Sequence, residues 1–446
     1  MFVVALPIMF QNLVTNLVSL LDNFMVGRLG TEQTSGVAIA NQILFIFNLT
    51  LFGAMSGPGV FTAQYHGKKD SEGIRYTVRF KAIAGMILFA FSLVIFTFGR
   101  GWLIDRFIHA GDVECDLELV RTFAEEYFLI MMTGLLPFII TQIFASTMRE
   151  TGDTFMPMVA SFVAVGTNCV LNYILIFGKL GVPEEITGVR GAAIATVTAR
   201  VVECVIVVVS MYRRKARFPY LKGTFKSLRI PKKVASLVAT KSAPLICNEL
   251  CWSVGMTLLG VCYSYYGGSV VAGYSISSTV WNLFTISFMS FGTAIGIIAG
   301  NFLGAREFDK AADAARKMTA FSLVLSFLVS FLLFFIGSRV PLLYEVTENT
   351  KSYASNFIRI DSFFLPVFAI VHASYFTVRS GGKTLITLLF DSFFTLGFAA
   401  PIAFAVYFIF RPQILVLYTI VQSLDIIKCV FGLILVKKKI WIRDIV

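Results

Sequence analysis

The chain has 446 residues, of which 57% are hydrophobic and only 14% are charged. Typical soluble domains have about 45–50% apolar and about 25% charged residues, so this composition excludes an ordinary soluble protein. In a soluble protein the formal net charge of +12 would suggest a nucleic-acid partner, but here the basic residues lie between apolar runs. We therefore expect the lipid bilayer as a partner, and no nucleic acid.

Apolar runs long enough to cross a hydrocarbon core of about 30 Å follow one another along the whole chain. A transmembrane β-barrel would alternate in blocks of about ten residues, and these runs do not. We therefore predict an all-α polytopic membrane protein with twelve transmembrane helices. Their expected ranges are 2–26, 37–63, 80–99, 124–147, 155–177, 189–212, 240–264, 270–300, 316–337, 353–378, 385–410 and 414–436.

Lysine and arginine are distributed unequally between the two sides of the membrane. Most of them fall in alternate loops, and the central segment MYRRKARFPYLKGTFKSLRIPKK is the richest. Because cytoplasmic loops carry the excess of basic residues, we expect both termini in the cytoplasm and the protein in the plasma (inner) membrane. Contact of the central segment with anionic lipid is a sufficient explanation of its charge.

The two halves of the chain repeat one another in the same order. The run from Pro7 aligns with the run from Pro244, GVAIAN with GYSISS, and MRETGDT with VRSGGKT. Chance similarity of apolar segments would not keep several motifs in unbroken order. We predict an N-terminal six-helix bundle over 1–212, a basic linker over 213–239 and a C-terminal six-helix bundle over 240–446. Since six is even, the bundles have the same orientation, related by an axis along the membrane normal.

The order LPIMFQNLVTNLVSLLDNFMVGRLG, NYILIFG, GVRGAAIAT, NELCWSVG and RSGGKT resembles the multidrug and toxic compound extrusion (MATE) transporter family over essentially the whole chain. The resemblance implies a twelve-helix fold of two bundles. It also implies efflux of organic, often cationic, drugs in exchange for sodium ions or protons.

The first helix carries a stripe of polar residues that ends at an acid. The stripe would line a cavity or a helix interface, because its members recur at spacings of three and four. They are Asn12, Thr15, Asn16, Ser19, Asp22 and Asn23. A buried Asp22 could accept a proton or bind sodium, whereas an interfacial aspartate could simply stay hydrated. In the resembled family, an acid at this position belongs to a cation site of the N-terminal lobe.

Asn168 and Asn172 lie one turn apart in the fifth expected helix, and Thr196 lies in the sixth. Amide oxygens suit a hard cation, so these residues could share a site with Asp22. The alternative is ordinary helix–helix hydrogen bonding by asparagine. The resemblance assigns Asn168 and Asn172 to the site of Asp22, although some relatives carry an aspartate where this chain has Asn172.

In the second half, Glu249 lies well inside the membrane, beyond the cytoplasmic end of its helix. The resemblance implies a functional glutamate here. Some relatives add an aspartate in the tenth helix, but the expected depth holds Val367 and His372. Asp361 lies too close to the outer end of that helix, which leaves Asp391 as an alternative partner of Glu249.

Polar residues of the second and eighth helices are candidates for a central substrate cleft. With Asp391, the predicted lining is Asn41, Gln42, Asn48, Ser278 and Asn282. Aromatic residues are plentiful, and an aromatic cavity suits planar cations through stacking and cation–π attraction. Most phenylalanines in such a chain simply meet lipid or core, so no individual aromatic is singled out.

Two charged pairs occupy matching places in the halves, with their charges reversed. Arg200 and Glu203 are three residues apart, as are Asp425 and Lys428. We interpret each as an i,i+3 ion pair that neutralises itself near the cytoplasmic end.

The sequence has no Walker A motif, no catalytic triad and no cluster of metal ligands, so neither an ATP-driven pump nor an enzyme is expected. No cofactor is expected beyond H⁺ or Na⁺ as coupling ion. We predict secondary active export of small organic cations by a chain that functions as a monomer. A flippase for a lipid-linked saccharide is the alternative, and a channel is a weaker one because a two-half repeat favours alternating access.

Overall fold

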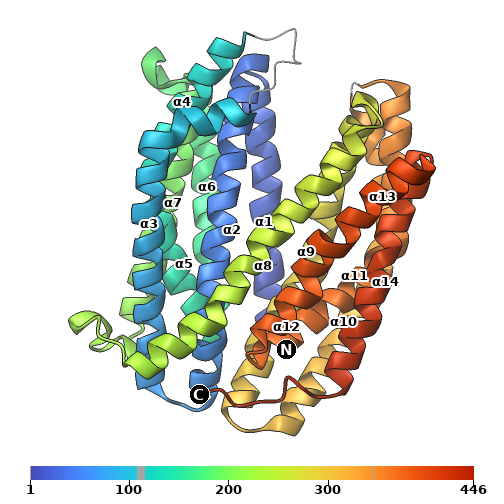
Figure 1. Cartoon of the computed structure of the whole chain (residues 1–446). Helices are drawn as coiled ribbons and strands as arrows, with labels where there is room; N and C mark the ends of the chain where they lie inside the picture. The colour runs from blue at the N-terminus through green and yellow to red at the C-terminus, as the bar shows by residue number, and fades with distance from the viewer. Residues whose placement is uncertain (1, 108–115, 345) are drawn as a thin grey trace. The chain divides into compact units, whose positions relative to one another are not determined.

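The computed structural model describes residues 2–107, 116–344 and 346–446, and the regular structure in these ranges is helical (Figure 1). The first half holds α1 (Phe2–Gly27), α2 (Thr31–Gly67), α3 (Ser71–Phe107), α4 (Leu117–Thr133), α5 (Leu135–Glu150), α6 (Phe155–Ile176) and α7 (Gly188–Arg213). The second half holds α8 (Lys232–Ser264), α9 (Gly268–Gly304), α10 (Phe308–Phe335), α11 (Glu348–Ser380), α12 (Thr384–Leu388), α13 (Ala400–Phe410) and α14 (Ile414–Lys437).

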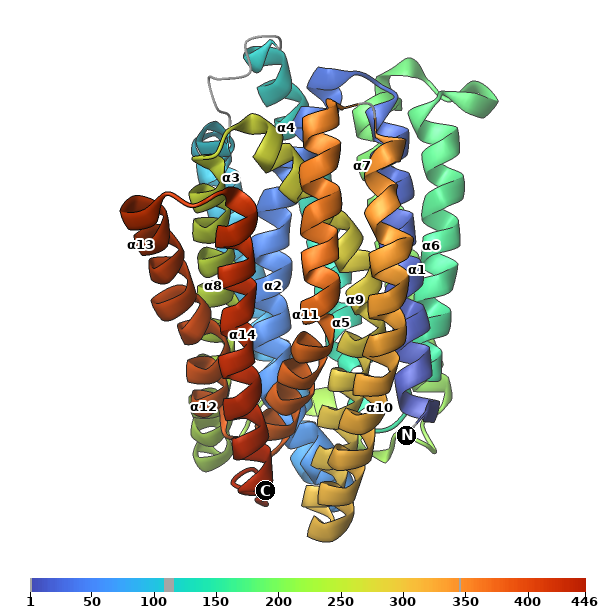
Figure 2. The same ribbon diagram turned by 90° about the vertical axis from the view of Figure 1, so that its right-hand side faces the viewer.

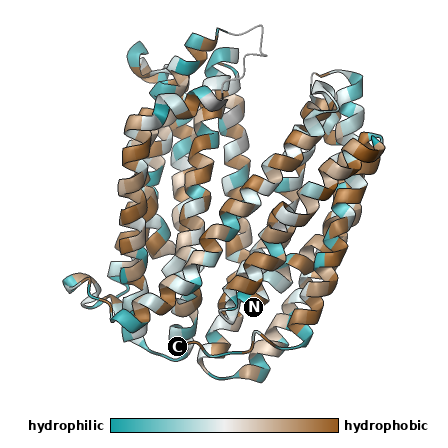
Figure 3. Ribbon diagram, in the orientation of Figure 1, coloured by the Kyte–Doolittle hydropathy of each residue, from teal (hydrophilic) through white to brown (hydrophobic). Residues whose placement is uncertain are grey.

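The expected multi-pass, all-α architecture is confirmed. Within the described ranges, 10 helices are long and apolar enough to cross a membrane, or up to 12 if each of two bent pairs is one span. Apolar residues run along the helices in Figure 3, and hydrophilic residues gather at many helix ends and connections. Hydrocarbon offers the backbone no hydrogen-bond partners, so helices satisfy the peptide groups internally.

The fourth expected span is broken rather than straight. α4 and α5 meet at an angle of 47°. Pro137 lies in the first turn of α5 and has no N–H to donate to the carbonyl of Thr133, so the helical ladder is interrupted there. A second bend of 43° divides α9 between Ile286 and Phe288.

The seventh span is longer than expected, because α8 begins at Lys232 and not near residue 240. Pro231 directly precedes it, a place where a missing N–H costs nothing. The remaining linker is held on α3: Arg75 Nε donates to the carbonyl of Tyr220 at 3.1 Å, and Arg79 Nε to that of Thr224 at 2.7 Å.

Close contacts divide the chain into two compact units. The N-terminal unit comprises Phe10–Gly59 and Ser71–Ala235, and the C-terminal unit comprises Met1–Met9, Val60–Asp70 and Ser236–Val446. The predicted division into bundles of 1–212 and 240–446 stays a prediction.

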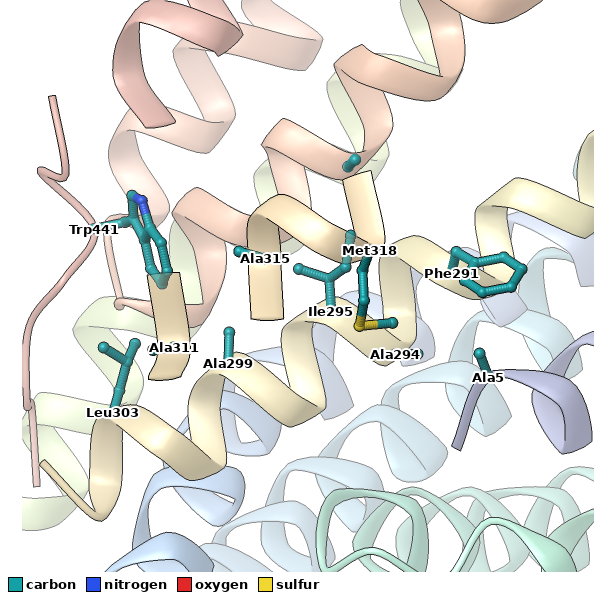
Figure 4. Close-up of a cluster of buried hydrophobic side chains, with 11 residues drawn as sticks. Ala5, Phe291, Ala294, Ile295, Ala299, Leu303, Ala311, Ala315, Met318 and Trp441 are labelled. Atoms are coloured by element: carbon teal, nitrogen blue, oxygen red, sulfur yellow. The ribbon is translucent and has the colours of Figure 1, made fainter. Parts of the chain in front are cut away.

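In the C-terminal unit, α9, α10, α11 and α14 run side by side (Figure 2). Small side chains let α9 and α10 approach closely, as Ala299 and Ala311 do in the buried cluster of Figure 4. Trp441 of the C-terminal tail is buried in the same cluster. At the end of α9, a Cβ on Gly304 would lie 1.8 Å from the carbonyl oxygen of Gln64, so only glycine fits.

Candidate functional site

Four of the predicted ion-site residues meet inside the N-terminal unit. Asp22 projects from α1, Asn168 and Asn172 from α6, and Thr196 from α7. The amide nitrogen of Asn172 donates to Asp22 Oδ1, and it lies 3.1 Å from Asn168 Oδ1. Asn168 and Asn172 are only 6% and 1% exposed. The arrangement surrounds one carboxylate with buried amides.

The orientation of the Asn168 amide decides how many of the polar atoms in this cluster have a hydrogen-bond partner. When the amide is turned about its last bond, its nitrogen lies 2.8 Å from Asp22 Oδ1 and its oxygen accepts from Thr196 Oγ1 at 3.3 Å. Both asparagines then donate to the aspartate. A carboxylate that receives such bonds is stabilised in its charged form.

Helix packing explains why these residues converge. Asn168 and Asn172 are four residues apart and therefore share one face of α6. That face meets α7 closely, since a Cβ on Gly191 would lie 2.6 Å from the carbonyl oxygen of Leu175. Asp22 lies about 8 Å along α1 from its last residue, Gly27, which places the site toward one end of the unit.

Tyr127 of α4 is a member that sequence reasoning missed. Its side chain is 5% exposed, and its hydroxyl donates to Asn41 Oδ1 at 3.4 Å. The same hydroxyl lies near Thr196 of α7, so Tyr127 connects α2 with the surroundings of Asp22. The available signal was a hydroxyl-bearing aromatic among apolar residues, which needs a partner when buried.

The predicted cleft residues fall in both units. Asn41 joins the Tyr127 hydroxyl, whereas Gln42 is exposed and Asn48 is half-buried. In the C-terminal unit, Ser278 is half-buried and Asn282 is exposed. A common cleft lined by these residues stays a prediction.

Asp391 is held inside the C-terminal unit. It lies in a π-helical segment, Leu389–Phe393, between α12 and α13. Its two oxygens lie 3.2 Å from Asn248 Nδ2 and 3.5 Å from Lys428 Nζ. Lys428 also lies 3.5 Å from Asp425, which confirms the predicted i,i+3 pair. Lys428 therefore partly neutralises the charge of Asp391.

Glu249 belongs to this second cluster and not to that of Asp22. It lies near Asn248, Arg379 and Asp391. The expected partnership of Glu249 with Asp391 stays a prediction. At the corresponding place in the first half, the guanidinium of Arg200 lies 4.8 Å from the ring centroid of Phe138. Among the described ion pairs there is none between Arg200 and Glu203.

α11 extends farther on the N-terminal side of Asp361 than expected. α11 begins at Glu348, capped by the hydroxyl of Thr347, and not near residue 353. Asp361 therefore lies about 20 Å along the helix from its first residue. Its side chain is 2% exposed and accepts three hydrogen bonds, from Ser277, Tyr418 and Gln422.

Comparison with known proteins agrees with this architecture. The family model described as MatE matches residues 7–174 and 244–404. The probable multidrug resistance protein YoeA of Bacillus subtilis is 23% identical over 402 residues, covering 89% of this chain and 84% of YoeA. The probable multidrug resistance protein NorM of Thermotoga maritima is 26% identical over 407 residues, covering 90% of this chain and 83% of NorM.

Solved structures share the fold. An outward-facing multidrug resistance MATE family transporter of the MOP superfamily superposes with a TM-score of 0.86 at 19% identity, over 98% of this chain and 94% of that one. A MOP superfamily transporter from Pyrococcus furiosus gives 0.85 at 18% identity, with the same coverage. Because the family model spans most of both halves, the chain belongs to the MATE family of membrane transporters and is not an enzyme.

Proposed function

We propose that this chain exports amphipathic organic cations in exchange for protons or sodium ions, with access alternating between its two bundles. The observation that carries the proposal is the single carboxylate of Asp22 gathered with Asn168, Asn172 and Thr196. The names of the curated relatives, which are multidrug resistance proteins, support the cargo class.

The chemistry of the cluster suits an exchangeable cation. A membrane-depth carboxylate is costly without a functional or structural reason. When Asp22 is charged, the amides of Asn168 and Asn172 stabilise it by donating hydrogen bonds. When a proton or sodium ion binds, at least one of these donors must turn away, and the relation of α1 to α6 changes. An ion drives a transport cycle only through such a difference in affinity between conformations.

Glu249 is proposed as a second coupling residue. It lies beside the Asn248–Asp391–Lys428 cluster, where a change in its charge would alter the balance among these groups. The cargo is proposed to pass Asn41, Gln42, Asn48, Ser278, Asn282 and Asp391. Weakly polar surfaces of this kind accommodate organic cations of different shapes better than a rigid set of charges.

The proposed setting is the plasma (inner) membrane, with both termini cytoplasmic and a monomer as the functional form. The basic linker between α7 and α8 supports this orientation, because lysines and arginines accumulate on the cytoplasmic side.

A flippase for a lipid-linked saccharide is the alternative. The Pyrococcus furiosus neighbour is described as having a binding pocket of reversed polarity that suggests a different function. A shared fold therefore leaves the cargo open.

The test is transport in liposomes that contain the purified protein. Ethidium movement is followed under an imposed proton gradient and, separately, an imposed sodium gradient, for the wild type, Asp22→Asn, Glu249→Gln and Glu118→Gln. The control Glu118 is an exposed acid in the first turn of α4. We expect one gradient to drive ethidium in the wild type and in Glu118→Gln but not in Asp22→Asn. If neither gradient moves ethidium in the wild type, drug export is rejected and labelled lipid flipping is measured next.

A further inference from the structure

Asp361 of α11 is an almost fully enclosed carboxylate that the proposed transport cycle leaves unused. Its Oδ1 accepts from the Tyr418 hydroxyl and from Gln422 Nε2, both at 2.7 Å, and its Oδ2 accepts from the Ser277 hydroxyl at 3.0 Å. The donors come from α9 and α14. Three helices therefore converge on one acid.

Among the described residues, no lysine, arginine or histidine forms an ion pair that compensates the charge of Asp361. The shell is aromatic: Phe357 lies 4.6 Å from the ring of Tyr418, while Tyr263 and Tyr274 lie 5.6 and 6.3 Å from it.

The nearest charged groups on the neighbouring helices are already engaged. On α14, Asp425 follows Gln422 by one turn and is paired with Lys428 at 3.5 Å. On α11 itself, Arg359 faces α10, where its guanidinium lies 6.0 Å from the ring centroid of Phe334. The ionisable groups that face Asp361 from α8, α9 and α14 are the tyrosines Tyr263, Tyr274 and Tyr418. All three are neutral or negative, so none of them offsets a negative Asp361.

A proton fits this site with the reversal of a single hydrogen bond. If Oδ2 is protonated, it donates to Ser277 Oγ, whose hydroxyl turns away, while Oδ1 keeps both of its donors. A sodium ion does not fit in the same way. Gln422 Nε2, Tyr418 OH and Asp361 Oδ1 contact one another at 2.7–3.0 Å, and the amide nitrogen that faces the acid would repel a metal ion.

One member of the Asp361 site is less buried than the other three. Asp361, Ser277 and Tyr418 are 2%, 1% and 4% exposed, whereas Gln422 is half-buried. Rotation of the Gln422 side chain would break its hydrogen bond to Asp361 Oδ1 and uncover that oxygen.

We propose that Asp361, with Ser277, Tyr418 and Gln422, forms an exchangeable proton-binding site in the C-terminal unit. The site is separate from Asp22 in the N-terminal unit. It is also separate from the depth of Val367 and His372, where the family resemblance places a tenth-helix acid. It gives the C-terminal unit a proton site of its own, whichever ion Asp22 binds.

Infrared difference spectroscopy on the purified full chain in lipid tests the proposal without measuring transport. Spectra are taken between acid and alkaline buffers that contain no sodium. We expect a carboxylic acid C=O band that titrates in the wild type and in Glu118→Gln, and that disappears in Asp361→Asn. Tyr418→Phe keeps the acid but removes a donor to its charged form, so the band should remain with its midpoint about one pH unit higher.

Three outcomes would overturn the proposal: an unchanged band in Asp361→Asn, an unmoved midpoint in Tyr418→Phe, or loss of the wild-type band on addition of sodium chloride. Tyr418→Phe and Ser277→Ala carry the test if Asp361→Asn does not fold. The same band is also measured in Asp22→Asn. If Asp361 carries the proton, the band persists there whether or not Asp22 takes part in transport, so the Asp361 site and the role of Asp22 are tested separately.

Discussion

Lys81 of α3 and Glu150 of α5 form an ion pair inside the N-terminal unit, with Nζ 2.5 Å from Oε2 and the lysine side chain fully buried. Ser146 and Thr147 accept further hydrogen bonds from the same ammonium group. The pair joins two helices at one point and satisfies both charges there.

Removing the cation should therefore destabilise the unit strongly. Lys81→Met deprives Glu150 of its ammonium partner, and breaking a buried pair typically costs about 3–5 kcal/mol. We expect a clear fall in the thermal midpoint of the purified protein in detergent. Lys81→Met with Glu150→Gln should recover part of the loss, since no unbalanced charge remains. Equal midpoints for the single and double variants would contradict this account.

Gly304 should be intolerant of even one methyl group. A Cβ there would lie 1.8 Å from the backbone oxygen of Gln64, and backbone cannot move aside as a side chain does. We expect Gly304→Ala to lower the thermal midpoint by several degrees. Gly260→Ala is the matched control in the same unit, because nothing lies within 4 Å of the added atom. Equal effects of the two substitutions would argue against the close approach of α2 and α9.

Substitutions of Lys428 and of Asp391 should differ in their effect on the stability of the C-terminal unit. Lys428→Met removes the cation that Asp391 and Asp425 share, and leaves two acids near each other. Asp391→Asn keeps Lys428 paired with Asp425. We therefore expect Lys428→Met to reduce folded yield and thermal midpoint, and Asp391→Asn to change them little. The reverse order would show that Lys428 is not the centre of this cluster.

Periodicity and run length predicted the spans well, because a bilayer allows few alternatives to an apolar helix. Run length alone did not locate the break between α4 and α5, although Pro137 marks a possible flex point in this helix. The start of α11 was placed too late because its polar first residues, from Glu348, were assigned to a loop. Helix ends rich in polar residues carry little hydropathy signal.

The cluster around Asp22 was accessible from sequence because Asn168 and Asn172 repeat on one face of α6. Tyr127 was not, since its role depends on which face of α4 meets α7. An ion pair was expected at matching positions in the two halves. Asp425 and Lys428 form theirs, whereas Arg200 lies over the ring of Phe138. A repeat predicts where helices lie better than it predicts which side chains meet.

Tyr127 offers a test of whether hydrogen bonds around the Asp22 cluster contribute to ion binding. Tyr127→Phe keeps the ring in its buried place but removes the hydroxyl that donates to Asn41. If Asp22 couples transport, we expect the apparent affinity for the driving ion to fall about fivefold, the worth of roughly 1 kcal/mol for one hydrogen bond. Tyr173→Phe, on an exposed tyrosine of α6, should leave it unchanged. A loss of ethidium binding without loss of ion affinity would instead place Tyr127 in the cargo path.

Asn172→Asp should change which ion the N-terminal site prefers. Asn172 lies against Asp22, and a second carboxylate there would attract a metal ion that one acid with donating amides does not favour. Two adjacent acids also resist ionising together, so a bound cation stabilises the doubly charged pair. We expect ethidium transport by Asn172→Asp to gain dependence on the sodium gradient and to weaken under a proton gradient alone. The measurement is the ratio of the two rates in liposomes, relative to wild type and to Asn168→Asp. If sodium stimulates wild type and Asn172→Asp equally, the single carboxylate already suffices for sodium, and the amide at residue 172 does not select the ion.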